Sequence, residues 1–78
     1  MSDWKETDEG LKKTFEFDDF KSAFSFMTRV AFEAEAQQHH PDWRNVYKTV
    51  EVTLSTHDAD GAVTDKDRKL AKAIDAVG

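Results

Sequence analysis

Residues 20–41, FKSAFSFMTRVAFEAEAQQHHP, decide the fold because their apolar side chains recur three and four positions apart. This spacing predicts an amphipathic helix about five turns long. Either Asp18 or Asp19 can cap its start. Pro41 disfavours helical backbone angles at His40, so the helix is predicted to end at about His39 or His40. The stripe predicted to face the core comprises Phe20, Ala23, Phe24, Met27, Val30, Ala31 and Ala34.

The segments on both sides of this helix have the period of two that is typical of strands. Residues 11–17, LKKTFEF, place Leu11, Lys13, Phe15 and Phe17 on one side. Trp4 can pin a short edge strand in front of them. Residues 46–57, VYKTVEVTLSTH, are rich in β-branched side chains and predict one long strand, or two strands with a bend, ending at His57. The face expected to be buried carries Val46, Val50, Val52 and Leu54.

A second helix is predicted over residues 64–77, TDKDRKLAKAIDAV. Thr64 is a candidate N-cap with Asp67 at the third helical position, and the buried stripe is Leu70, Ala71, Ile74 and Val77. Before it, HDADGA is expected to form a loop in which Gly61 is free to take a positive φ. The order strand, helix, strand, helix predicts an α+β fold, with helices packed on one face of an antiparallel sheet.

Length and composition reduce the number of function classes that fit this chain. The 78 residues suit one small domain with a limited core, so a dimer is expected and a partner subunit is expected to complete any deep pocket. A formal charge of -5, with no basic run among aromatics, argues against direct nucleic-acid binding. The absence of cysteine excludes disulfides, thiolate metal sites and a cysteine nucleophile. An acidic start and the lack of a long apolar run predict a soluble, cytoplasmic protein.

The end of the first helix carries a cluster of polar side chains that suits acid–base chemistry. Glu35 and His39 are four residues apart and share a helix face, so the carboxylate is expected to pair with the imidazole. His40 falls where the chain leaves the helix, and its ring is expected to point elsewhere. His57 is expected to approach from the end of the long strand. Three imidazoles and a carboxylate around one cleft predict proton transfer near neutral pH.

Other interpretations of the same residues remain open. Histidines near a helix C-terminus often serve only to complement the helix dipole. Glu35, His39 and His57 form a possible metal site of two histidines and a carboxylate, although no metal-motif spacing is present. Asp67 is explained equally by a capping box. Trp43 is either a core residue or a stacking surface, and Phe32 lies off the apolar stripe, where it lines a pocket or a subunit contact.

A longer pattern resembles a known family. The spacing of seven residues is similar to the signature of the pterin-4a-carbinolamine dehydratases: Glu35, His39, His40, Pro41, Tyr47, His57 and Asp67. Three residues separate Glu35 from His39, five separate Pro41 from Tyr47, nine separate Tyr47 from His57, and nine separate His57 from Asp67. Four longer segments also look like that family: FSFMTRVAFEAE, HHPDWRNVY, VTLSTHDADGAVTDKD and LAKAID. The resemblance covers nearly the whole chain from Trp4 onward.

This resemblance implies an enzyme that dehydrates 4a-hydroxytetrahydropterin to quinonoid dihydropterin in tetrahydrobiopterin recycling, with no metal and no organic cofactor. It implies a four-stranded antiparallel sheet with helices on one side, assembled as a homodimer or homotetramer. The implied catalytic and pterin-contacting residues are His39, His40 and His57. Glu35 and Asp67 would support them, and Pro41 and Trp43 would shape the pocket.

Two departures from the family pattern stand out. Members usually carry a further helix before the strand that holds Trp4, and in this single domain of residues 1–78 that helix is missing or truncated. The loop between His57 and Asp67 is one residue longer than in the animal form, so Asp65 and Asp67 both stand near the family position. The rival interpretation is a non-catalytic, dimeric protein-interaction or transcriptional cofactor module on the same fold. The three intact histidines favour the enzyme.

Overall fold

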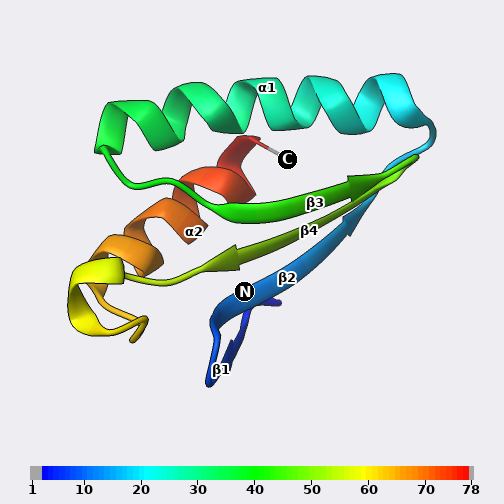
Figure 1. Cartoon of the computed structure of the whole chain (residues 1–78). Coiled ribbons are helices and arrows are strands. Elements are labelled where there is room, and N and C mark those ends of the chain that lie inside the picture. Colours follow the sequence, from blue (N-terminus) through cyan, green and yellow to red (C-terminus); the bar gives the residue numbers. More distant parts are fainter. Residues whose placement is uncertain (1–2, 78) are drawn as a thin grey trace.

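The computed structural model describes residues 3–77, except for the side chain of Asp58, as a two-layer α+β sandwich (Figure 1). Its antiparallel sheet has the order β1-β2-β4-β3. The strands are β1 (Lys5–Thr7), β2 (Gly10–Glu16), β3 (Asp42–Val46) and β4 (Thr49–Leu54). The helices are α1 (Phe20–Gln37), the short 3-10 helix η1 (His57–Ala59) and α2 (Asp65–Val77). The predicted fold class is confirmed.

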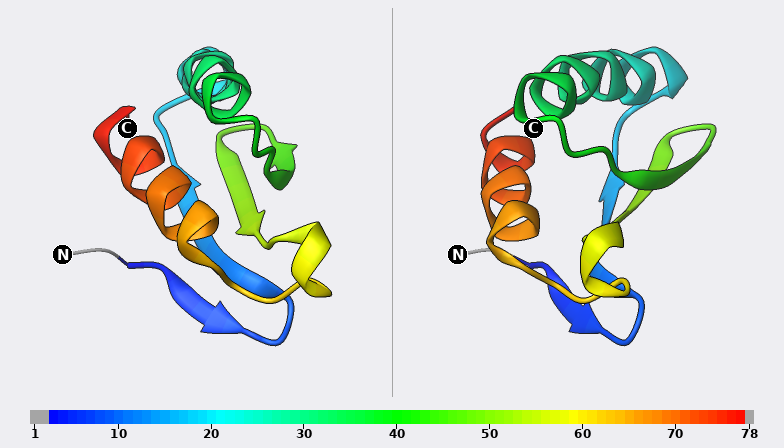
Figure 2. Two further views of the ribbon diagram at one scale, coloured as in Figure 1. Left: turned by 90° about the vertical axis from the view of Figure 1, so that its left-hand side faces the viewer. Right: turned by 60° about the vertical axis from the view of Figure 1, so that its left-hand side comes forward.

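Both long helices cover the same face of the sheet (Figures 1 and 2). Phe15 and Phe17, at the end of β2, pack against Phe26 of α1 with ring centroids 4.8 and 4.9 Å apart. Lys13, on the same side of β2, donates to Asp75 of α2 over 2.8 Å. The alternation seen in the sequence therefore turns one side of β2 toward the helices, as predicted.

The buried stripe of α1 differs in part from the predicted one. Ala23, Val30 and Ala34 are buried as expected, but the large central side chain is Phe26, which is fully buried. Phe20 and Phe24 are 49% and 52% exposed and pack on each other instead. Phe24 and Phe26 each suit the spacing of a helix face, so periodicity alone did not determine which of them faces the sheet.

The cap of α1 is Asp19. Its side chain accepts a hydrogen bond from the Ser22 amide over 2.8 Å, which satisfies one of the free N–H groups of the first turn. Asp18 is exposed and makes no comparable contact.

Asp19→Ala is therefore expected to lower the free energy of unfolding by about 1 kcal/mol. Asp18→Ala is the matched control and should change it by less than about 0.5 kcal/mol. Urea denaturation of both variants measures the difference. Equal losses in the two variants would contradict the assignment of the cap.

The segment after α1 forms two strands rather than one, which was one of the two predicted alternatives. They are joined by a turn at Tyr47 and Lys48, where Tyr47 has a positive φ of 51°. The Asn45 amide donates to the carbonyl oxygens of Tyr47 and Thr49 and fixes this turn. One boundary and one burial prediction were wrong. β4 ends at Leu54 rather than at His57, and Val46, which was expected to be buried, is 54% exposed because it precedes the turn.

The predictions for α2 are confirmed. Leu70, Ala71 and Ile74 are buried, and Val77 packs against the same core. Gly61 in the preceding loop has a φ of 81°, which glycine adopts at little cost. Among residues 3–77, neither helix is long and apolar enough to span a membrane.

Candidate active site

The site begins where α1 ends, and α1 ends earlier than predicted. Gln37 is the last helical residue, and Gln38 takes a left-handed conformation whose amide donates back to the carbonyls of Ala34 and Glu35. This left-handed cap ends the helix before Pro41 has any influence. His39 and His40 therefore lie outside the helix, so the predicted helical geometry between Glu35 and His39 does not apply.

His39 turns toward the start of α2. Its Nε2 lies 2.5 Å from Oδ1 of Asp67, and only 11% of the His39 side chain is exposed. The C-terminal end of α1 and the start of α2 lie at the same end of the sandwich (Figure 1), and His39 and Asp67 are in contact there. Asp67, not Asp65, is the acid that contacts a histidine.

Asp67 is fully buried and is held by three donors. Besides His39, the Thr56 hydroxyl donates to its Oδ2 over 2.8 Å and the Thr64 amide over 2.9 Å. Burial alone would raise the pKa of Asp67, but the bonds from His39, Thr64 and Thr56 outweigh it and hold the pKa below its ordinary value of 3.8. The site therefore contains a carboxylate in its ionised form at neutral pH.

The capping box at the start of α2 is thus part of the site as well. The bond from the Thr64 amide to Asp67 confirms the predicted pairing between the N-cap and the third helical position. The same carboxylate uses its other oxygen for His39. Asp67 has both of the roles that the sequence left open, one in capping the helix and one in contacting a histidine.

Glu35 pairs with His40, not with His39 as expected. His40 Nε2 lies 2.9 Å from Glu35 Oε1, and both side chains are exposed, at 62% and 71%. Hydrogen bonds from His40 and Gln38 lower the pKa of Glu35. The two adjacent histidines do diverge as predicted, because His39 contacts a buried acid and His40 a solvated one.

His57 is the first residue of η1 and is exposed. No hydrogen bond joins its ring to another described residue. Its backbone nevertheless follows directly on Thr56, whose hydroxyl contacts Asp67, so it lies next to the network that holds His39. Pro41 links α1 to β3, and Trp43 on β3 is partly buried against the core, opposite Val52.

The predicted metal-binding alternative used Glu35, His39 and His57. In the described part of the chain, no group of three or more histidine, aspartate or glutamate side chains is placed so that it could hold a metal ion.

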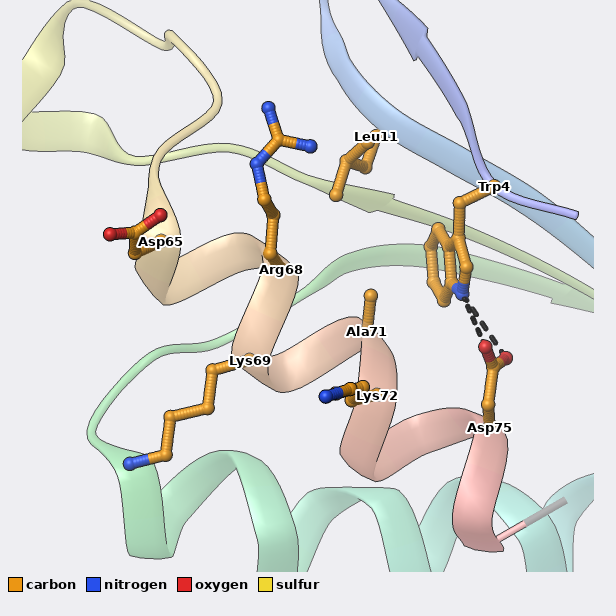
Figure 3. A pocket seen from close by; sticks show the side chains of 8 residues that line it. All are labelled: Trp4, Leu11, Asp65, Arg68, Lys69, Ala71, Lys72 and Asp75. Carbon is orange, nitrogen blue, oxygen red and sulfur yellow. Dashed lines mark hydrogen bonds between the residues drawn. The ribbon is translucent and has the colours of Figure 1, made fainter. Parts of the chain in front are cut away.

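A pocket of about 580 Å³ lies elsewhere, between α2 and the part of the chain that holds Trp4 and Leu11 (Figure 3). Trp4 donates its indole N–H to Asp75 at one end of it. None of the predicted histidines is among its lining residues, which are Trp4, Leu11, Asp65, Arg68, Lys69, Ala71, Lys72 and Asp75. The histidine site therefore lies outside this pocket.

Sequence reasoning named Thr64 as a helix cap but missed Thr56, which also holds Asp67. Thr56 is buried, and its hydroxyl also lies 2.5 Å from that of Thr64. A threonine in a strand-rich segment is ordinary, and its contact with α2 is the hydrogen bond to Asp67, 11 residues later in the chain. The one available signal was that Thr56 directly precedes His57.

Fold and site together define the class: a small α+β sandwich that holds a histidine against a buried carboxylate where its long helix ends. The model of the family described as pterin 4 alpha carbinolamine dehydratase matches residues 1–77. The chain belongs to this family, as the resemblance predicted.

Individual relatives agree with this assignment. A protein from Christiangramia forsetii, named "Putative pterin-4-alpha-carbinolamine dehydratase", is 57% identical over 74 residues, which make up 95% of this chain and 75% of the relative. A Bradyrhizobium protein of the same name is 58% identical over 79 residues, covering 99% of this chain and 78% of its own.

Two solved structures share the fold. A transcriptional coactivator/pterin dehydratase from Brucella melitensis is 42% identical, with a TM-score of 0.87 over 95% of this chain and 80% of its own. A pterin dehydratase-like protein identified as a RuBisCO assembly factor in the alpha-carboxysome is 23% identical, with a TM-score of 0.79 over 95% of this chain and 87% of its own. At that identity the second likeness concerns the fold alone.

Proposed function

We propose that this protein is a lyase that dehydrates a pterin 4a-carbinolamine to quinonoid dihydropterin. The observation that carries the proposal is the 2.5 Å contact between His39 and the buried Asp67. Membership in the dehydratase family supports the choice of substrate. Without Asp67, a histidine at the end of α1 would be explained by the helix dipole alone.

The reaction needs two proton transfers and no covalent intermediate. A base takes the proton from ring nitrogen N5, and the electron pair of that N–H bond forms a double bond to C4a. The C4a–O bond breaks, and an acid protonates the departing hydroxyl, which leaves as water. One positioned imidazole for each transfer contributes about 10²- to 10⁴-fold.

Within this proposal, His39 and His57 are the proton-transfer pair. Asp67 orients His39, because a ring nitrogen held by a buried carboxylate keeps one orientation and one tautomer. The exposed pair of His40 and Glu35 binds the pterin, and Pro41 and Trp43 shape the adjoining wall. No step requires a metal or an organic cofactor.

Stopped-flow dehydration of synthetic 4a-hydroxytetrahydropterin, with and without the protein and in buffer containing EDTA, tests this function. We expect the protein to accelerate formation of the quinonoid product well above the spontaneous rate. A rate that the protein leaves unchanged would contradict the proposal. Loss of the acceleration in EDTA, with recovery on adding zinc or iron, would point instead to a metal enzyme.

His40→Ala is expected mainly to raise KM and to leave kcat within a few-fold of the wild-type value. The reason is that His40 contacts an exposed carboxylate and is proposed to bind the substrate in its ground state. Steady-state kinetics of this variant check the expectation. Glu35→Gln, which removes the charge that His40 contacts, should shift KM in the same direction. A large fall in kcat at unchanged KM would assign His40 to the chemical step instead.

The proposal includes a cytoplasmic homodimer or homotetramer. Phe20, Phe24 and Phe32 on the outer side of α1 are exposed, the last of them by 72%. Aromatic side chains are enriched at protein–protein contacts relative to the rest of the surface. We expect sedimentation at micromolar concentration to show at least a dimer, and Phe32→Ser to weaken it. A purely monomeric wild-type protein would contradict this part of the proposal.

The second candidate function is a non-catalytic module that binds a protein partner. The same exposed aromatic side chains of α1 favour it, and the name of the Brucella melitensis relative includes the role of a transcriptional coactivator for that protein. The stopped-flow measurement separates the two candidates, because a pure interaction module does not accelerate dehydration.

A further inference from the structure

The hydrogen bonds around Asp67 determine where the proton on His39 lies. An ionised carboxylate has only acceptor atoms, so every group that contacts it must donate. Its Oδ2 accepts from the Thr56 hydroxyl and the Thr64 amide, and its Oδ1 lies 2.5 Å from His39 Nε2. His39 therefore carries a proton on Nε2 and donates it to Asp67.

The two threonine hydroxyls are ordered by the same argument. The Thr56 hydroxyl has a single hydrogen, which it donates to Asp67. In the 2.5 Å contact between Thr56 and Thr64, the Thr64 hydroxyl must then be the donor. A one-way chain of donors thus runs from Thr64 through Thr56 to Oδ2 of Asp67, and Oδ1 is the oxygen that faces His39.

The other ring nitrogen of His39 is free for chemistry. Nδ1 makes no hydrogen bond to a described residue. Among those residues, no buried side-chain nitrogen or oxygen lacks a partner, so Nδ1 must reach the solvent. In the neutral ring with its proton on Nε2, Nδ1 is also the nitrogen with the lone pair.

We propose that His39 exchanges its proton with the substrate through Nδ1, and that Thr56 and Thr64 are positioning residues that fix this tautomer through Asp67. This inference rests on the proposed function. When His39 acts as a base, Nδ1 takes a proton while the Nε2–H group stays hydrogen-bonded to Asp67. When it acts as an acid, the doubly protonated ring gives up the Nδ1 proton. In either direction Asp67 remains ionised, and the ring does not have to turn.

Nitrogen-15 NMR of the histidine side chains, recorded on the whole protein across neutral pH, tests the ring assignment. His39→Ala identifies which signals belong to His39. We expect the neutral His39 ring to carry its proton on Nε2, with Nδ1 unprotonated. A neutral ring protonated on Nδ1 would overturn the inference, and this readout depends on no substrate.

Thr56→Val tests the positioning role, because valine keeps the shape of threonine and removes the hydroxyl. Asp67 then loses one donor and Thr64 loses its acceptor, so the carboxylate is freer to turn. We expect a mixture of His39 tautomers and a fall in kcat of about 10-fold or more at nearly constant KM, similar to the loss when a group that orients a metal-bound imidazole is removed.

Thr56→Ser restores the hydroxyl and is expected to recover both the tautomer and most of kcat. Thr53→Val, three residues earlier on β4 and without a side-chain hydrogen bond to another described residue, is the matched control and should change neither. An unchanged tautomer and kcat in Thr56→Val would overturn the positioning role. If the wild-type protein does not accelerate dehydration, the proposed function fails, while the NMR spectrum still decides the tautomer.

Discussion

His39→Ala is expected to lower kcat for dehydration by about 100-fold or more, the effect of losing a side chain that transfers a proton in the transition state. His39 is placed for this role by a buried acid, whereas His40 contacts an exposed one. KM should change little, because the loss falls on the chemical step. Stopped-flow kinetics measure both constants.

The matched control is Gln37→Ala, two residues earlier at the end of α1, whose side chain makes no hydrogen bond with a described residue. His57→Ala should resemble His39→Ala if the two rings form the proton-transfer pair. A result in which His40→Ala damages kcat most while His39→Ala is nearly silent would show that the roles are assigned wrongly, even if the protein is a dehydratase.

Asp67→Asn should also lower kcat by about 100-fold or more, although asparagine has nearly the same shape. The amide loses the negative charge and presents a donor on one side, so it no longer holds the Nε2 proton of His39. An equivalent change in serine proteases costs about 10⁴-fold because the histidine adopts the wrong tautomer. Asp65→Asn, two residues earlier and exposed, is the matched control and should leave kcat unchanged.

The stability of Asp67→Asn must be measured beside its kinetics, since Asp67 also caps α2. Circular dichroism and urea denaturation will show whether the variant is folded under assay conditions. A folded Asp67→Asn protein with wild-type kcat would contradict the orienting role of Asp67.

The fold was accessible from the sequence because hydrophobic period is a strong signal in a small sandwich. The alternation of Leu11 to Phe17 and the stripe of α2 were sufficient to predict strands, helices and layers. The rotation of α1 about its own axis could not be predicted, because Phe24 and Phe26 both suit a helix face. Which of them is buried depends on the strands opposite, where Phe15 and Phe17 meet Phe26.

The sequence named candidate site residues, and the structure changes some of the contacts expected between them. The spacing of Glu35, His39 and Asp67 marked them as candidates, but the pairing of Glu35 with His39 assumed that the helix continues. A left-handed Gln38 ends it first, and glutamine at such a position gives little local warning. The contact between His39 and Asp67 joins residues 28 positions apart, so it arises only from the packing of α1 against α2.

The central claim is that His39 and Asp67 act as one unit in proton transfer, and a double-mutant cycle in the stopped-flow assay tests it most directly. Four proteins are compared: wild type, His39→Ala, Asp67→Asn and the double variant. If Asp67 acts through His39, removing the ring removes the benefit of the acid, and the double variant should have nearly the same kcat as His39→Ala. Losses in the two single variants that multiply in the double variant would contradict the claim.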